Sequence, residues 1–123
     1  MDTLYHEELL ELYHHPLNKK TLPNATIHHI EHNPLCGDRI ELYLLIEHDR
    51  IIDIGFQGSG CVLSDIGGSL LTEAVKHKNM AEARTITPET ILTAAGIDQL
   101  NPTRIRCITL AFEALKKIVA SHQ

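Results

Sequence analysis

Hydrophobic and polar residues alternate along the first half of the chain and follow a helical period in the second half. Residues 39–48 and 50–57 alternate between apolar and polar side chains, the period-two pattern of strands with one buried face. A shorter run, residues 25–32, is also compatible with a strand. Because only short connections separate these runs, they predict a three-stranded antiparallel meander.

Helical periodicity appears on both sides of this predicted sheet. Apolar residues recur at helical spacing over residues 3–13, and Pro16 ends that pattern. Further helices are predicted over residues 62–77, 79–84, 88–95 and, as one continuous helix with a single apolar stripe, 105–119. Strands followed by helices predict an α+β fold, with the helices packed on one face of the sheet. A length of 123 residues suits one domain spanning residues 1–123.

Composition and charge exclude several classes of protein. The chain is 43% apolar and 22% charged, as in ordinary globular proteins, and no apolar run approaches the roughly 20 residues of a membrane span. The first residues alternate acidic with apolar side chains, unlike a signal or transit peptide, so we expect a cytoplasmic protein. A formal net charge of −5, with scattered lysines and arginines, argues against nucleic acid as the main partner.

The three cysteines are the main candidates for chemistry. Cys36 lies in a turn before a predicted strand, Cys61 lies between a strand and a helix, and Cys107 lies near the start of the last helix. An odd number of cysteines fits a disulfide framework poorly, and sparse cytosolic cysteines more often bind metals or act in catalysis. If these element ends meet, three thiolates and the Asp38 carboxylate would suit zinc or part of an iron–sulfur cluster. On spacing alone, three separate buried cysteines are an open alternative, because no C-x-x-C pair is present.

The neighbours of the cysteines are compatible with such a site. Cys61 at a helix N-terminus would have its thiolate stabilised by the helix dipole. Arg104 and Arg106 flank Cys107 and could favour its thiolate, although solvated charges at a helix start are an equal alternative. Asp38 could also simply cap its own turn.

The helix after Cys61 begins with an unusual run, SDIGGS. We expect Ser64 and Asp65 to satisfy backbone N–H groups of the first turn, and Gly67 and Gly68 to allow tight helix packing.

Three segments, NPLCGD, GSGCVLS and RIRCITLAFEAL, resemble, in this order, the cysteine motifs of the iron–sulfur cluster assembly family that includes IscU, SufU and the N-terminal domain of NifU. The opening LYHEELLELYHHPLNKKTL resembles the family's first helix and following turn, so the resemblance covers nearly the whole chain. It implies an α+β fold with a three-stranded antiparallel sheet, and a ligand set of Cys36, Asp38, Cys61 and Cys107 for zinc or an iron–sulfur cluster. It also implies sulfur transfer from a cysteine desulfurase. The residues around the cysteines make Cys36 and Cys107 the candidate acceptors: we expect Cys36, in its Pro- and Gly-flanked turn, if the metal is zinc, and Cys107, beside the two arginines, if the protein is a cluster scaffold.

Within this family, the chain is most similar to SufU. Arg106 stands where IscU proteins typically carry a histidine, and NPLCGDRIEL and RIRC are closer to the SufU motifs. The chain nevertheless lacks the insertion that SufU usually has between its last two cysteines, and SDIGGS replaces an Ala/Ser-rich stretch.

The resemblance leaves alternative functions open. The protein could be a scaffold or carrier that assembles a nascent cluster, with Asp38 making the site easier to open than an all-thiolate site. Alternatively it could be a zinc-dependent persulfide sulfurtransferase of the SufU type, without cluster binding. A purely structural zinc domain is less favoured, because a chain of this length can build its own core.

Expected partners are a SufS- or IscS-like cysteine desulfurase and, downstream, apo iron–sulfur proteins or other assembly factors, with no nucleic acid or membrane. We expect a monomer or weak homo-oligomer.

Overall fold

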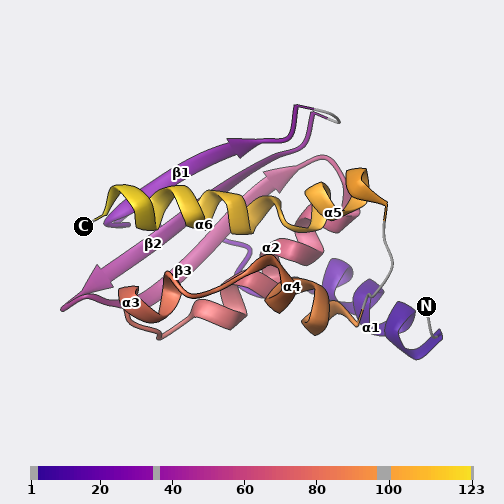
Figure 1. The fold of residues 1–123 in the computed structure, drawn as a ribbon, viewed down its shortest axis with the longest axis horizontal. Coiled ribbons are helices and arrows are strands. Elements are labelled where there is room, and N and C mark those ends of the chain that lie inside the picture. The colour runs from indigo at the N-terminus through magenta and orange to yellow at the C-terminus, as the bar shows by residue number, and fades with distance from the viewer. Residues whose placement is uncertain (1–2, 35–36, 97–100, 123) are drawn as a thin grey trace.

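The computed structural model describes residues 3–34, 37–96 and 101–122, and over residues 3–6 it describes the helical backbone only. The elements follow in the order α1 (Thr3–His14), β1 (Ile27–His32), β2 (Arg39–Glu47), β3 (Arg50–Ser59), α2 (Val62–Val75), α3 (Met80–Ala83), α4 (Pro88–Ala95), α5 (Pro102–Ile108) and α6 (Leu110–Ser121) (Figure 1). No helix in these ranges is both long and apolar enough to cross a membrane.

The three strands form an antiparallel sheet in the order β1-β2-β3, which confirms the predicted meander. Leu42 of β2 lies opposite His29 of β1 and Phe56 of β3, so all three strands direct alternate residues to the same face. The pairing of β2 with β3 shifts by one position between Leu45 and Ile46.

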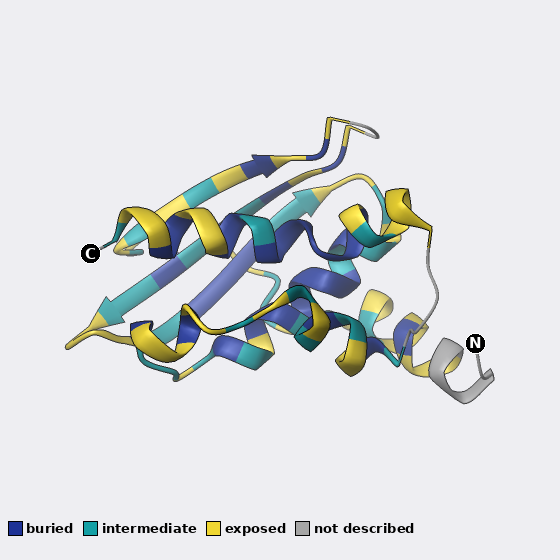
Figure 2. Cartoon of the chain, in the orientation of Figure 1, coloured by how far each residue is buried: buried dark blue, intermediate teal, exposed yellow. Residues whose placement is uncertain are grey.

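The helices cover the apolar face of this sheet, as predicted. Ile40, Leu42 and Leu44 of β2 are fully buried there. Helix α6 packs on β1 and β2, while α2 packs on β3 (Figure 1). Helix α6 has both buried and exposed turns, whereas nearly all of α2 is buried or intermediate in exposure (Figure 2). This agrees with the packing of α1 and α4 on α2, which itself packs on the sheet.

The end of the chain differs from the predicted continuous helix, because α5 and α6 are separated at Thr109. The backbone of Thr109 has φ −100° and ψ 11°, outside the helical range. Its hydroxyl donates a hydrogen bond to the carbonyl oxygen of Ile105 at 2.6 Å, a side-chain contact that often bends helices. A single apolar stripe does not reveal such a bend, which is why the prediction was wrong at this point.

The predicted tight packing at Gly67 and Gly68 is confirmed. A Cβ atom at Gly67 would overlap the carbonyl group of Ile108, and a Cβ atom at Gly68 would overlap the ring of Phe56. Helix α2 therefore approaches α5 to backbone contact. This contact brings the start of α2 and the end of α5 close together.

Candidate metal centre

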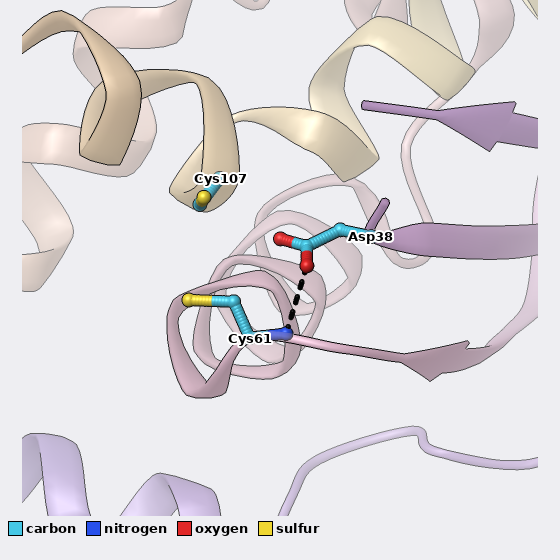
Figure 3. Close-up of side chains that lie close together, drawn as sticks. All are labelled: Asp38, Cys61 and Cys107. Carbon is cyan, nitrogen blue, oxygen red and sulfur yellow. Dashed lines mark hydrogen bonds between the residues drawn. The ribbon is translucent and has the colours of Figure 1, made fainter. Parts of the chain in front are cut away.

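Three of the four predicted ligands lie together where three segments meet. Asp38 precedes β2, Cys61 precedes α2 and Cys107 belongs to α5, and one ligand atom from each lies within 4.8 Å of the other two (Figure 3). Donor atoms of a tetrahedral zinc site with sulfur ligands lie roughly 3.8 Å apart. The three donor atoms, all within 4.8 Å of one another, are therefore close to the spacing of a metal-bound set.

The three residues differ in exposure. Asp38 is 2% exposed and Cys107 is 4% exposed, whereas Cys61 is only partly buried. The fourth predicted ligand, Cys36, lies outside the described residues. Its role stays a prediction from the sequence.

The Asp38 carboxylate is held against the first turn of α2. Oδ1 accepts a hydrogen bond from the backbone N–H of Cys61 at 3.0 Å, and Oδ2 accepts one from the hydroxyl of Ser64 at 2.7 Å. Ser64 therefore contacts a candidate ligand, which the sequence reasoning did not foresee. Asp65 instead forms an ion pair with Lys19, whose Nζ lies 2.9 Å from Oδ2.

Gly60 makes room for this carboxylate. Its φ of +124° is one that side-chain-bearing residues rarely adopt, and a Cβ atom there would overlap the carboxyl group of Asp38. The absence of a side chain at position 60 thus allows the Asp38 carboxylate to reach the Cys61 N–H group.

Cys61 is the N-cap residue of the 14-residue helix α2. Its Sγ accepts a hydrogen bond from the backbone N–H of Leu63 at 3.3 Å. A helix N-terminus carries partial positive charge, so the sulfur lies where negative charge is favourable.

Cys107 is contacted by a residue that sequence reasoning did not identify. The side-chain amide of Asn33 donates a hydrogen bond to Cys107 Sγ at 3.7 Å in a buried environment. Asn33 is itself 3% exposed. The available signal was its position as the first residue of the NPLCGD motif.

The flanking arginines lie at the surface. Arg104 and Arg106 are both exposed, which agrees with the alternative that they are solvated charges at a helix start. Arg106 also lines a cavity of about 320 Å³ together with His32, Asn33 and Glu113.

The donors present fit a thiophilic metal. Two sulfur atoms and one carboxylate oxygen converge from three separate segments, and this donor set suits zinc or iron in an iron–sulfur cluster. The space at Gly60 and the hydrogen bonds to Asp38 orient the oxygen donor toward the sulfurs (Figure 3).

Comparison with known proteins identifies the family of the chain. The family model of the NifU-like N-terminal domain matches residues 4–123. The chain is 31% identical to the zinc-dependent sulfurtransferase SufU of Bacillus subtilis (strain 168), across 100% of this chain and 94% of that protein. It is 29% identical to the iron–sulfur cluster assembly scaffold protein IscU 1 of Archaeoglobus fulgidus, across 97% of this chain and 76% of that protein.

Solved structures show the same fold. A crystal structure described as a hypothetical protein has a TM-score of 0.80 at 29% identity, with 98% of this chain and 99% of that one covered. A NifU-like N-terminal protein from Brucella abortus has a TM-score of 0.75 at 17% identity, covering 94% of this chain and 92% of that one, and its likeness concerns the fold alone. By its motifs, its fold and the family match over residues 4–123, this chain belongs to the NifU-like N-terminal domain family of iron–sulfur cluster assembly proteins, with SufU and IscU among its relatives.

Proposed function

We propose that this protein binds a metal ion or nascent iron–sulfur cluster through Cys36, Asp38, Cys61 and Cys107 and accepts sulfur from a cysteine desulfurase. The observation that carries the proposal is the convergence of Asp38, Cys61 and Cys107 from three separate elements to within 4.8 Å. Cys36 joins this set in the proposal because it precedes Asp38 by two residues, a length of chain that spans at most about 7 Å.

The four proposed ligands are of two chemical kinds. The three cysteines would supply soft sulfur donors, and Asp38 would supply a harder oxygen that releases a thiophilic metal more easily than a fourth thiolate. Bound zinc would keep its thiolates deprotonated at neutral pH. A mixed donor set of this kind suits transfer rather than permanent storage.

In the sulfur transfer, a cysteine thiolate of this protein attacks the outer sulfur of a persulfide on the desulfurase. A bond forms between that outer sulfur and the attacking cysteine, and the outer sulfur's bond to the desulfurase cysteine breaks. The electron pair of the broken bond stays on the desulfurase sulfur, which leaves as a thiolate. The proton of the outer sulfur remains on that outer sulfur. The step exchanges one persulfide for another and needs no oxidant or reductant.

We assign the first attack to Cys36 rather than to Cys107. An acceptor sulfur must be reached by a partner protein, and Cys107 is 4% exposed. Cys107 would then serve as a buried ligand, and as an acceptor only after α5 moves.

A zinc-dependent persulfide sulfurtransferase without cluster binding is the second candidate. The observation that favours it is the 31% identity to the Bacillus subtilis protein named for that activity, over the whole of this chain. Arg106, which stands where IscU proteins typically carry a histidine, also favours this second candidate. In both candidates the desulfurase is the partner.

Metal analysis separates the two candidates. Protein purified without added iron is assayed for zinc, iron and acid-labile sulfide, alongside single Cys→Ser variants at positions 36, 61 and 107. Iron with acid-labile sulfide supports the scaffold, and tightly held stoichiometric zinc supports the sulfurtransferase. The variants should lose the metal in either case.

Sulfur acceptance is tested with a cysteine desulfurase and free cysteine. We expect this protein to raise desulfurase turnover and to gain one sulfur by mass spectrometry, with the added sulfur on Cys36. If the triple Cys→Ser variant still stimulates the desulfurase and accepts sulfur, the proposed function is wrong.

A further inference from the structure

We infer that Asn33 is a positioning residue that ties the turn between β1 and β2 to Cys107 and slows release of the bound metal. The inference rests on the proposed function and assigns a role to a residue outside the ligand set. Its basis is the set of hydrogen bonds made by Asn33 at both its backbone and its side chain.

The backbone of Asn33 closes the turn that carries Asp38. Its N–H donates to the carbonyl oxygen of Asp38 at 2.9 Å, and its own carbonyl accepts from the N–H of Gly37 at 2.9 Å. These two bonds hold the ends of segment 33–38 together, so movement of Asn33 would move Asp38 as well.

The side chain of Asn33 connects this turn to α5. Its amide donates to Cys107 Sγ at 3.7 Å, across 74 positions of sequence. Both residues are buried, at 3% and 4% exposure, and hydrogen bonds to sulfur are less screened by water in such a place. Asn33 thus links two of the segments that meet at the candidate centre.

This contact has two consequences for a bound metal. An amide that donates to a metal-bound thiolate stabilises the charge on its sulfur, and loss of such supporting contacts typically lowers metal affinity about 10- to 100-fold. Loss of the same contact would also free the turn to move away from α5. Both effects accelerate metal release.

The test compares Asn33→Leu, which keeps a similar size but removes the donor, with the wild type and a control variant. The control is Thr72→Val, because Thr72 is fully buried and its hydroxyl lies within hydrogen-bond distance of the carbonyl oxygens of Gly68 and Ser69. The hydroxyl also accepts a hydrogen bond from the side-chain amide of Asn18. Thr72 lies 11 residues beyond Cys61, about 16 Å along α2. The Thr72→Val substitution therefore removes buried hydrogen bonding from the same fold at a distance from the candidate metal centre.

Three measurements are made on each protein: zinc affinity, the rate of zinc loss to a chelator, and the absorption spectrum after substitution with Co²⁺. For Asn33→Leu we expect zinc affinity to fall at least 10-fold and zinc loss to accelerate. The sulfur-to-cobalt charge-transfer band should move to lower energy, because a sulfur without the amide donor gives up an electron more easily. Thr72→Val should match the wild type in all three.

The charge-transfer band separates a direct contact from general destabilisation, which would not shift it. An Asn33→Leu protein with wild-type zinc affinity and an unshifted band would overturn the inference while leaving the proposed function intact. A wild type that binds neither zinc nor cobalt would overturn both. If Asn33→Leu does not fold by circular dichroism, Asn33→Ala is measured in its place and judged by the same outcomes.

Discussion

The two buried carboxylates on either side of the turn between β1 and β2 are held in different ways. Glu31 is 9% exposed and receives the ammonium group of Lys117 on both oxygens, at 2.9 and 2.8 Å, with His29 Nε2 at 3.0 Å from Oε1. Asp38 is 2% exposed and accepts hydrogen bonds from two neutral donors, the N–H of Cys61 and the hydroxyl of Ser64.

This difference separates a structural ion pair from a candidate ligand. Burial of a carboxylate is costly, and for Glu31 the cation of Lys117 offsets that cost within the protein. For Asp38, the Cys61 N–H and the Ser64 hydroxyl hold the carboxylate against the start of α2, beside the sulfurs of Cys61 and Cys107. Under the proposed function, this carboxylate also binds the metal. Changes around Asp38 should therefore affect metal binding, and changes around Glu31 should affect stability alone.

The largest effect is expected from Gly60→Ala. The new methyl group would overlap the Asp38 carboxyl group, and the residue would have to keep a φ of +124° or move. We expect the free energy of unfolding of the metal-free protein to fall by about 2–5 kcal/mol, from backbone strain and overpacking together. Urea unfolding at pH 7 measures it, and zinc binding should weaken because Asp38 is displaced.

Gly37→Ala is the matched control for this change. Gly37 has a φ of +71°, but among the described residues, its chain neighbours aside, no atom lies within 4 Å of a Cβ placed there. We therefore expect Gly37→Ala to lower the free energy of unfolding through backbone strain alone, by about 1–2 kcal/mol. Equal losses in the two variants would mean that the contact between position 60 and Asp38 is not important.

Replacing Asp38 tests whether its carboxylate is a ligand or only supports α2. Asp38→Ala removes the acceptor for Cys61 N–H and for the Ser64 hydroxyl, which should destabilise the metal-free protein by about 2 kcal/mol. Asp38→Asn keeps one carbonyl oxygen and should lose about half as much. If Asp38 is a ligand, both variants should release zinc to a chelator at a rate that differs from the wild type. Wild-type release from Asp38→Asn would show that the residue is not a ligand.

The fold was largely predictable because its signals are local. The alternation around Ile40, Leu42 and Leu44 is a property of consecutive residues, and it correctly placed the buried face of β2. The bend at Thr109 was missed because it depends on a side-chain hydrogen bond to Ile105 that leaves the apolar stripe unchanged.

The candidate site was predictable only in part, for the same physical reason. Cysteines at three element ends suggested a meeting point, and the structure brings Cys61, Cys107 and Asp38 together. The supporting residues Asn33 and Ser64 were missed. Their partners lie 74 and 26 positions away, and no local pattern encodes a hydrogen bond at that separation.

The smallest effect is expected from Lys117→Met, which removes the cation beside Glu31 and keeps much of the apolar stem. Burial disfavours the ionised form of Glu31, but hydrogen bonds and charge from Lys117 and His29 outweigh it and place its pKa below the ordinary value of 4.5. Because the Lys117 side chain is 56% exposed, we expect a loss of only about 1 kcal/mol at pH 7.

The pH dependence of this loss identifies its cause. A carboxylate with a lowered pKa contributes stability that is complete above the pKa it has in the unfolded chain, and this stability disappears as the pH falls through the folded-state pKa. The difference in unfolding free energy between wild type and Lys117→Met should therefore be constant above about pH 5 and shrink below about pH 4.5. Zinc affinity should be the same in both proteins. A difference that persists unchanged at low pH would show that Lys117 acts through packing rather than through Glu31, and a loss of zinc affinity would mean that the two carboxylates are not independent.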